Sequence, residues 1–220
     1  MCYGDDARPP APPVSGPVGD HADLVLTSSD GTQFGAYFAH PATASPTGVV
    51  ILPDVRGLHS FYRELAQRFA EAGRHAVAID YFGRTAGIGA RDEDFPFREH
   101  MEKTASATVA EDVGAAVAWL RGQPSVTTVF TVGFCFGGAQ SWALSAGGHG
   151  LAGCICFYGG PSRVADLVPL MRAPLLMLAA GQDFTPVQEV QDFAARVQAE
   201  GVPVQVEVFP DAPHSFFDRT

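Results

Sequence analysis

A cysteine, an aspartate and a histidine occur in this chain in the order that nucleophilic catalysis on an α/β sheet requires. Cys135 lies between Gly133 and Gly137 in the pentapeptide Gly-Phe-Cys-Phe-Gly. The apolar residues 127–132 before it predict a buried strand, and the small residues 138–146 after it predict a helix. A strand, a sharp turn and a helix make up the G-x-nucleophile-x-G elbow, which exposes its central residue above the sheet. We therefore predict that Cys135 is a nucleophile.

An acid and a histidine follow in the expected chain order. Asp183 comes after the apolar run 174–179, and His214 comes after the alternating run 204–209. Both positions fit the acid and the base of an elbow enzyme, each on a loop after a strand. Each residue also has a simpler interpretation, because free cysteine is often a buried core residue and aspartate often forms turns. The agreement of all three favours a catalytic triad.

The chemistry expected of these residues is acyl transfer at an activated carbonyl group. A free thiol has a pKa of about 8.5, so little thiolate exists at neutral pH without a base. His214 would accept the proton of Cys135, and Asp183 would fix the imidazole tautomer. An acyl-thioester would then form and be hydrolysed by water. This scheme gives no role to a metal ion or an organic cofactor.

These motifs resemble the dienelactone hydrolases, also called carboxymethylenebutenolidases, a family of the α/β-hydrolase superfamily. The resemblance covers about residues 25–219 and depends on residues 133–138, 181–183 and 214–216. It implies a mostly parallel, doubly wound sheet with helices on both faces. It also implies a small-molecule ester or lactone substrate, of the dienelactone type and bearing a carboxylate.

The resemblance assigns further roles in the loop 53–57. Asp54 would lie beside the thiol and modulate it, although the family usually carries a glutamate there and Asp54 is one methylene shorter. The amides of Val55 and Phe136 would stabilise the tetrahedral oxyanion. Family members usually close with a helix after the histidine, so we expect the chain either to be truncated at Thr220 or to cover its sheet edge differently.

Two arginines resemble those with which the family binds the substrate carboxylate. Arg84 follows a predicted strand at the edge where open α/β sheets bind ligands. An ion pair that organises the loop is the alternative for Arg84. Arg219 lies one position further along than in the best-known members and next to the chain end.

The order of predicted elements also indicates an α/β fold. Segments 24–27 and 34–38 flank a Ser-Asp-Gly turn and predict an antiparallel hairpin. The continuously apolar segments 49–52 and 76–79 predict parallel strands covered on both faces. Helices are expected over about 61–72, over about 106–121 with an apolar stripe from Val109 to Leu120, and after residue 185, where Thr185 would cap the helix.

Composition limits where the protein works and what it binds. The 220 residues are 46% hydrophobic and 17% charged, which agrees with one domain after a flexible, proline-rich leader over 1–20. With the family resemblance, we expect residues 21–220 to form a single α/β-hydrolase domain. No apolar run approaches the roughly 18 residues that span a membrane, and the N-terminus has no signal-peptide pattern, so we expect a cytoplasmic protein without a membrane partner. The net charge of −10 disfavours nucleic acid as a partner.

Other classes of function stay open at this point. A general carboxylesterase or thioesterase for neutral acyl substrates would use the same triad. A thiol redox protein would need a second cysteine near Cys135, whereas Cys154 and Cys156 have the spacing of two core residues on one face of a strand. A noncatalytic binding module on the same fold is the third alternative. The oligomeric state is not specified.

Overall fold

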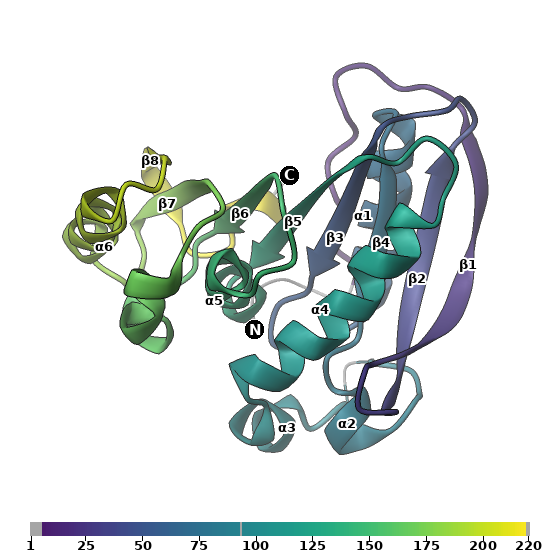
Figure 1. Cartoon of the computed structure of the whole chain (residues 1–220), viewed down its shortest axis with the longest axis horizontal. Helices are drawn as coiled ribbons and strands as arrows, with labels where there is room; N and C mark the ends of the chain where they lie inside the picture. Colours follow the sequence, from purple (N-terminus) through teal and green to yellow (C-terminus); the bar gives the residue numbers. More distant parts are fainter. Residues whose placement is uncertain (1–5, 93, 219–220) are drawn as a thin grey trace.

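A computed structural model describes residues 6–92 and 94–218, in which eight strands form one sheet in the order β1-β2-β4-β3-β5-β6-β7-β8 (Figure 1). β2 pairs antiparallel with β1 and β4, and every other neighbouring pair is parallel. The expected mostly parallel sheet is therefore confirmed. The strands are β1 (Val18–Thr27), β2 (Gln33–Pro41), β3 (Thr47–Leu52), β4 (His75–Ile79), β5 (Thr128–Phe134), β6 (Gly153–Phe157), β7 (Leu175–Gln182) and β8 (Val204–Pro213).

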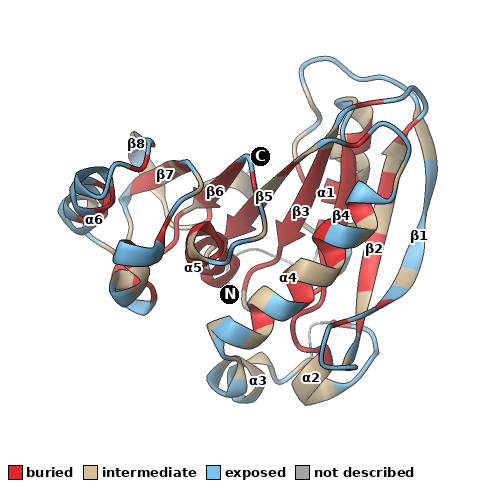
Figure 2. Cartoon of the chain, viewed as in Figure 1, coloured by how far each residue is buried: buried red, intermediate tan, exposed pale blue. Residues whose placement is uncertain are grey.

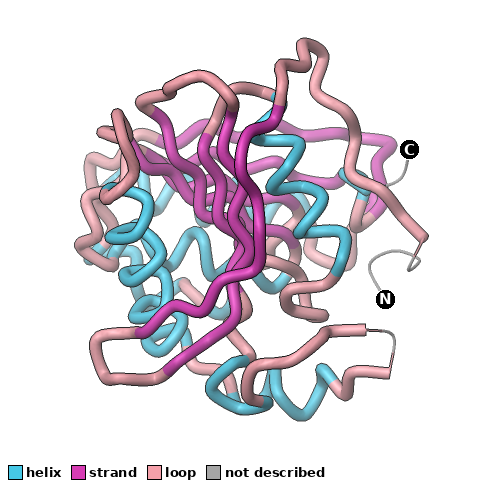
Figure 3. Tube along the Cα trace, turned by 90° about the vertical axis from the view of Figure 1, so that its right-hand side faces the viewer, coloured by secondary structure: helices cyan, strands magenta, loops and turns pink. Residues whose placement is uncertain are grey.

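Helices lie on both faces of this twisted sheet, as Figure 3 shows from the side. The α-helices are α1 (Ser60–Glu71), α2 (Gly83–Ala86), α3 (Phe97–Lys103), α4 (Ser106–Arg121), α5 (Phe136–Ala143) and α6 (Val187–Ala199). Short 3-10 helices are η1 (Leu144–Ala146), η2 (Pro161–Arg163), η3 (Ala165–Leu170) and η4 (Phe216–Asp218). No helix in the described ranges is long and apolar enough to cross a membrane.

Two cores form because successive side chains of a strand point to opposite faces. In β3, Val50 and Leu52 belong to the core that α4 and α5 cover, whereas Val49 and Ile51 belong to the core under α1. Figure 2 shows the resulting buried centre of the sheet. Continuous apolar sequence thus becomes a strand buried on both faces.

Helix α4 carries the apolar stripe that its sequence predicts. Val109, Val113, Val117 and Leu120 are all buried against the sheet. This stripe alone buries four large side chains, each of which contributes on the order of 1.5–3 kcal/mol when removed from water.

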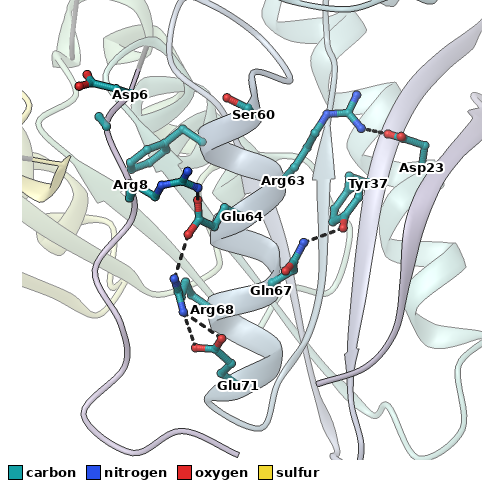
Figure 4. Close-up of a pocket in the computed structure, with 12 residues that line it drawn as sticks. Asp6, Arg8, Asp23, Tyr37, Ser60, Arg63, Glu64, Gln67, Arg68 and Glu71 are labelled. Carbon is teal, nitrogen blue, oxygen red and sulfur yellow. Dashed lines mark hydrogen bonds and ion pairs between the residues drawn. The ribbon is translucent and has the colours of Figure 1, made fainter. Parts of the chain in front are cut away.

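The N-terminal residues run along α1 before the sheet begins. β1 starts at Val18, so the sheet takes in the last residues of the segment 1–20 that was expected to form a leader. The amide of Gly16 donates to the carbonyl of Glu71 at 2.7 Å, and Arg8 pairs with Glu64 at 2.7 Å. A groove of about 670 Å³ lies along this side of α1, and most of its charged side chains pair with one another (Figure 4). These contacts connect the leader to α1.

A pair of histidines joins β2 to β4. Nδ1 of His75 lies 2.8 Å from Nδ1 of His40, whose ring stacks on Trp119 of α4 at 5.6 Å between centroids. Burial lowers the pKa of both histidines, and the charge of His75 lowers the pKa of His40 further. The folded protein therefore favours the neutral form of this pair.

We expect the free energy of unfolding to decrease as the pH falls below the ordinary histidine pKa of about 6.5. The unfolded chain takes up protons on His40 and His75 at a higher pH than the folded chain does, so acid favours unfolding. The contribution is complete above about pH 6.5 and is lost toward lower pH. Urea unfolding across this range should show a flatter pH dependence for His75→Gln than for the unsubstituted protein, and parallel curves would contradict the prediction.

Candidate active site

Cys135 lies in a strained turn between β5 and α5. Its backbone has φ 54° and ψ −114°, a conformation that costs a non-glycine residue energy and is typical of functional sites. The chain passes so closely here that a methyl group on Gly133 would overlap the carbonyl of Gly137, and one on Gly137 would overlap the carbonyl of Pro53. Both elbow glycines are therefore required by close backbone approach. The Cys135 side chain is partly buried.

Asp183 and His214 meet at the same edge of the sheet as Cys135. Asp183 directly follows β7, and His214 directly follows β8. Nδ1 of the imidazole lies 2.9 and 2.8 Å from the two carboxylate oxygens of Asp183, whose side chain is only 3% exposed. If Nδ1 donates to the carboxylate, Nε2 is the acceptor of the ring, as a general base requires.

Aromatic rings enclose the imidazole of His214. The ring centroid of Tyr158 lies 5.0 Å away and that of Phe184 lies 4.3 Å away. The amide of Cys135 donates to the carbonyl of Phe157, the residue before Tyr158, at 3.0 Å. The end of β6 thus lies between the elbow and the Asp183–His214 pair and brings these two parts of the site into one region.

The site lies where the order of the strands reverses. β3 pairs with β4 on one side and with β5 on the other. Open α/β sheets bind ligands in the crevice at the carboxyl ends of such strands. The loop of Val55 follows β3 and the elbow of Cys135 follows β5, so the two flank this crevice.

The two amides predicted to stabilise an oxyanion are both open. Within residues 6–92 and 94–218, neither the amide of Val55 nor that of Phe136 donates to a protein acceptor. Phe136 is the first residue of α5, where backbone amides have no partner in the helix and the helix dipole favours negative charge. This geometry allows both amides to bind a negatively charged oxygen.

Asp54 contacts its own loop. Its side chain is fully buried, Oδ1 accepts the amide of Arg56 at 3.0 Å, and Oδ2 lies 3.5 Å from Nε of Arg56. Among the described residues, the carboxylate makes no hydrogen bond to the thiol of Cys135. The short side chain thus holds the turn after β3, and a direct effect of Asp54 on the thiol stays a prediction.

Arg84 is occupied by two carboxylates. Nη2 lies 2.8 Å from Asp112, and Nη1 lies 2.5 Å from Asp30 and 3.0 Å from Thr32. The hydrogen bond to Arg84 lowers the pKa of Asp30. These contacts support the loop-organising ion pair and do not support a carboxylate-binding role for Arg84, because its donors are already used. Arg219, the second arginine predicted to bind substrate, lies outside the described residues.

We expect Arg84→Ala to destabilise the fold. The Asp112 side chain is fully buried, and removing its arginine leaves an uncompensated charge, which costs about 3 kcal/mol or more. Adding Asp112→Asn should recover part of this loss. The free energy of unfolding in urea checks both variants, and Arg121→Ala, which removes an exposed arginine, is the control. Unchanged stability together with a loss specific to anionic substrates would restore the binding role of Arg84.

The start of α6 differs from the expected capping pattern. The helix begins at Val187, its N-cap is Pro186, and no side chain caps it. The predicted cap by Thr185 is therefore wrong. Instead, the amide of Thr185 donates to Oδ1 of Asp183 at 3.3 Å, so the turn stabilises the acid directly.

Two further cysteines of the described residues lie in the core. Cys154 and Cys156 are fully buried on β6, as their spacing predicted, and both thiols are free. Burial raises the pKa of Cys154 to about 12 and raises that of Cys156 as well. Thiols that remain protonated are poor partners for thiol exchange, which weakens the redox alternative.

Sequence reasoning missed several residues around the site. Phe184 contacts His214, and the hydroxyl groups of Tyr62 and Tyr81 bind the backbone of Pro53 and Asp54. Tyr81 could have been found from its position two residues after the end of a predicted strand, where functional residues collect. Nothing in the local sequence marks Tyr62, because it lies within a helix.

The strand order and the elbow define the α/β-hydrolase fold. The sequence profile of the dienelactone hydrolase family matches residues 34–220, and the chain belongs to this family. It is thus a hydrolase acting on esters or lactones. A carboxymethylenebutenolidase of Pseudomonas putida is 32% identical over 201 residues, which cover 88% of this chain and 84% of the relative.

Solved structures agree with this placement. A Klebsiella pneumoniae protein described as a candidate dienelactone hydrolase superposes with a TM-score of 0.77 at 26% identity, over 90% of this chain and 89% of the other. A dienelactone hydrolase-like promiscuous phosphotriesterase from metagenomic libraries gives 0.75 at 25% identity, over 90% and 85%. An esterase of Pyrococcus furiosus gives 0.71 at 17% identity, over 95% and 91%, and shares the fold.

Proposed function

We propose that this protein hydrolyses a lactone or ester bond through Cys135, His214 and Asp183, with an acyl-thioester intermediate. The observation that carries the proposal is the part-buried Asp183–His214 pair at the carboxyl edge of the sheet, the edge at which Cys135 lies in a strained strand–turn–helix elbow. The open amides of Val55 and Phe136 support it.

The proposed reaction has two halves. His214 takes the proton of Cys135, the thiolate attacks the carbonyl carbon, and the carbonyl electrons move to oxygen, where the amides of Val55 and Phe136 stabilise the charge. The intermediate collapses to the thioester, and the leaving oxygen receives the proton from His214. In the second half, His214 removes a proton from water, the hydroxide attacks the thioester, and Cys135 leaves with the proton restored. Asp183 keeps the imidazole oriented throughout.

We expect Cys135→Ala to lower kcat by about 10⁴-fold or more on any ester that the protein cleaves, as triads do when they lose a member. Iodoacetamide should modify Cys135 before Cys154 and Cys156, because these two are buried thiols with raised pKa values. Mass spectrometry of the protein quenched during turnover should find the acyl group on Cys135. A folded Cys135→Ala protein with full activity would overturn the proposed triad.

For the substrate, we propose a dienelactone-type lactone that bears a carboxylate. Family membership supports this choice, and Arg163, next to the ring of Phe136, is the cation that we assign to the substrate carboxylate. Arg163 is exposed, its guanidinium lies 5.4 Å from the ring centroid of Phe136, and no described carboxylate pairs with it. An arginine without a carboxylate partner can bind a substrate carboxylate through paired hydrogen bonds.

A neutral ester is the second candidate, because the guanidinium of Arg84 is occupied by Asp30 and Asp112. The two candidates differ in how Arg163→Gln should act. For a carboxylated substrate, kcat/KM should fall by about 10-fold or more on a dienelactone and change little on p-nitrophenyl acetate. Arg121→Gln, whose arginine binds the Gly150 carbonyl at the opposite end of the sheet, is the charge-matched control. Equal effects on both substrates, or faster wild-type hydrolysis of the neutral ester, would favour the general esterase.

A further inference from the structure

Three of the four successive backbone amides after β3 have acceptors inside the protein. The amide of Asp54 donates to the hydroxyl of Tyr62 at 2.9 Å, that of Arg56 to the Asp54 carboxylate at 3.0 Å, and that of Gly57 to the Asp54 carbonyl at 3.2 Å. Of these four amides, that of Val55 is the one for which the described part of the chain provides no acceptor. The loop after β3 thus has one backbone amide in this stretch, that of Val55, available to bind a ligand oxygen.

Tyr81 binds the carbonyl side of the Asp54–Val55 peptide group, whose amide side is the open donor of Val55. It follows β4 and is 1% exposed; its hydroxyl donates to the carbonyl of Pro53 at 2.8 Å and also contacts the carbonyl of Asp54. In a trans peptide, the carbonyl and the next amide point in opposite directions within one plane. Binding the Asp54 carbonyl therefore determines where the amide of Val55 points.

The ring of Tyr81 also contacts the second amide-bearing residue. Its centroid lies 5.4 Å from that of Phe136, the first residue of α5. Because β4, β3 and β5 are neighbours in the sheet, one side chain reaches from the end of β4 past the loop of β3 to the elbow after β5. Tyr81 thus contacts both segments that carry these amides, the loop after β3 and the start of α5.

Tyr81 is itself held in place by its neighbour Asp80. Asp80 accepts the amide of Phe82 at 3.2 Å and pairs with the buried Arg91 at 2.7 Å. Gly57 packs so closely that a methyl group there would lie 2.8 Å from an Asp80 oxygen. Two successive residues after β4 therefore contact the loop after β3, one through its carboxylate and one through its hydroxyl.

We propose that Tyr81 is a positioning residue that orients the oxyanion-binding amides of Val55 and Phe136 without touching the substrate. This inference rests on the proposed function, because it needs a tetrahedral intermediate at Cys135. The hydroxyl acts through the Asp54–Val55 peptide, and the ring acts through Phe136. The expected signature is a weaker stabilisation of the transition state with substrate binding nearly unchanged.

Tyr81→Phe tests the role of the hydroxyl. We expect kcat for an ester to fall by about 10-fold to 100-fold, less than the loss of a whole oxyanion donor, and KM to change by less than about threefold. The rate of Cys135 alkylation by iodoacetamide should stay unchanged, because alkylation forms no oxyanion. Tyr37→Phe is the matched control, since it removes a buried hydroxyl that binds Gln67 at 2.8 Å and His21 at 2.7 Å, on β2.

Replacing Tyr81 with 4-aminophenylalanine restores a donor at the ring tip and should return kcat to within about threefold of the wild-type value. This variant also keeps the test decisive if Tyr81→Phe folds poorly. Wild-type kcat in Tyr81→Phe, an equal loss in Tyr37→Phe, or a parallel fall in alkylation rate would each overturn the positioning role. Failure of the proposed function itself would appear separately, as full activity in Cys135→Ala.

Discussion

The backbone of Gly137 lies directly against the carbonyl of Pro53, and the rest of the site depends on this contact. It brings the first turn of α5 to the end of β3, so Cys135, the proposed nucleophile, and the amide of Val55 lie at the same edge of the sheet. A side chain at Gly137 would separate them. The strained backbone of Cys135 is tolerated because β5 and α5 are packed on both sides and the amide of Cys135 is bound by Phe157. The elbow glycines shared with the family are therefore required by backbone packing as well as by the chemistry proposed for Cys135.

A buried polar cluster holds the loop after β3, and in our proposal it orients the site without taking part in a chemical step. Buried polar groups are costly unless they are bonded, and bonded groups restrict the backbone that carries them. The Asp54 carboxylate, the Arg56 guanidinium and the hydroxyl groups of Tyr62 and Tyr81 surround one short stretch of main chain. Such a network has little freedom to move when charge develops on the substrate. Preorganised donors of this kind need no reorganisation during the reaction.

Most arginines near the carboxyl edge of the sheet are paired with carboxylates. Arg56 faces Asp54, Arg91 faces Asp80, and Arg84 faces Asp112 and Asp30. Each guanidinium loses water on folding, and a nearby carboxylate offsets that cost. Arg163 differs because it is exposed and lies on an aromatic ring instead of a carboxylate. In a chain of net charge −10, most arginines near this edge have a carboxylate partner. In our proposal the arginine that binds a ligand is therefore one without such a partner.

The sequence by itself determined what depends on neighbours along the chain. Local patterns are the elbow glycines, the apolar runs of β3 and β5 and the apolar stripe on α4. From them the fold class, most helices and strands and the candidate triad could be predicted. Tertiary structure decided what depends on distant partners. Asp30 and Asp112 are 54 and 28 residues from Arg84, and the Tyr81 hydroxyl is 28 residues from Pro53, so no local pattern reveals that these groups meet. The start of α6 at Val187 was also missed. Thr185, the predicted cap, does not cap the helix, and its amide donates to the Asp183 carboxylate. Periodicity records which face a residue buries, whereas the partner of a buried polar group is chosen only when the strands pack side by side.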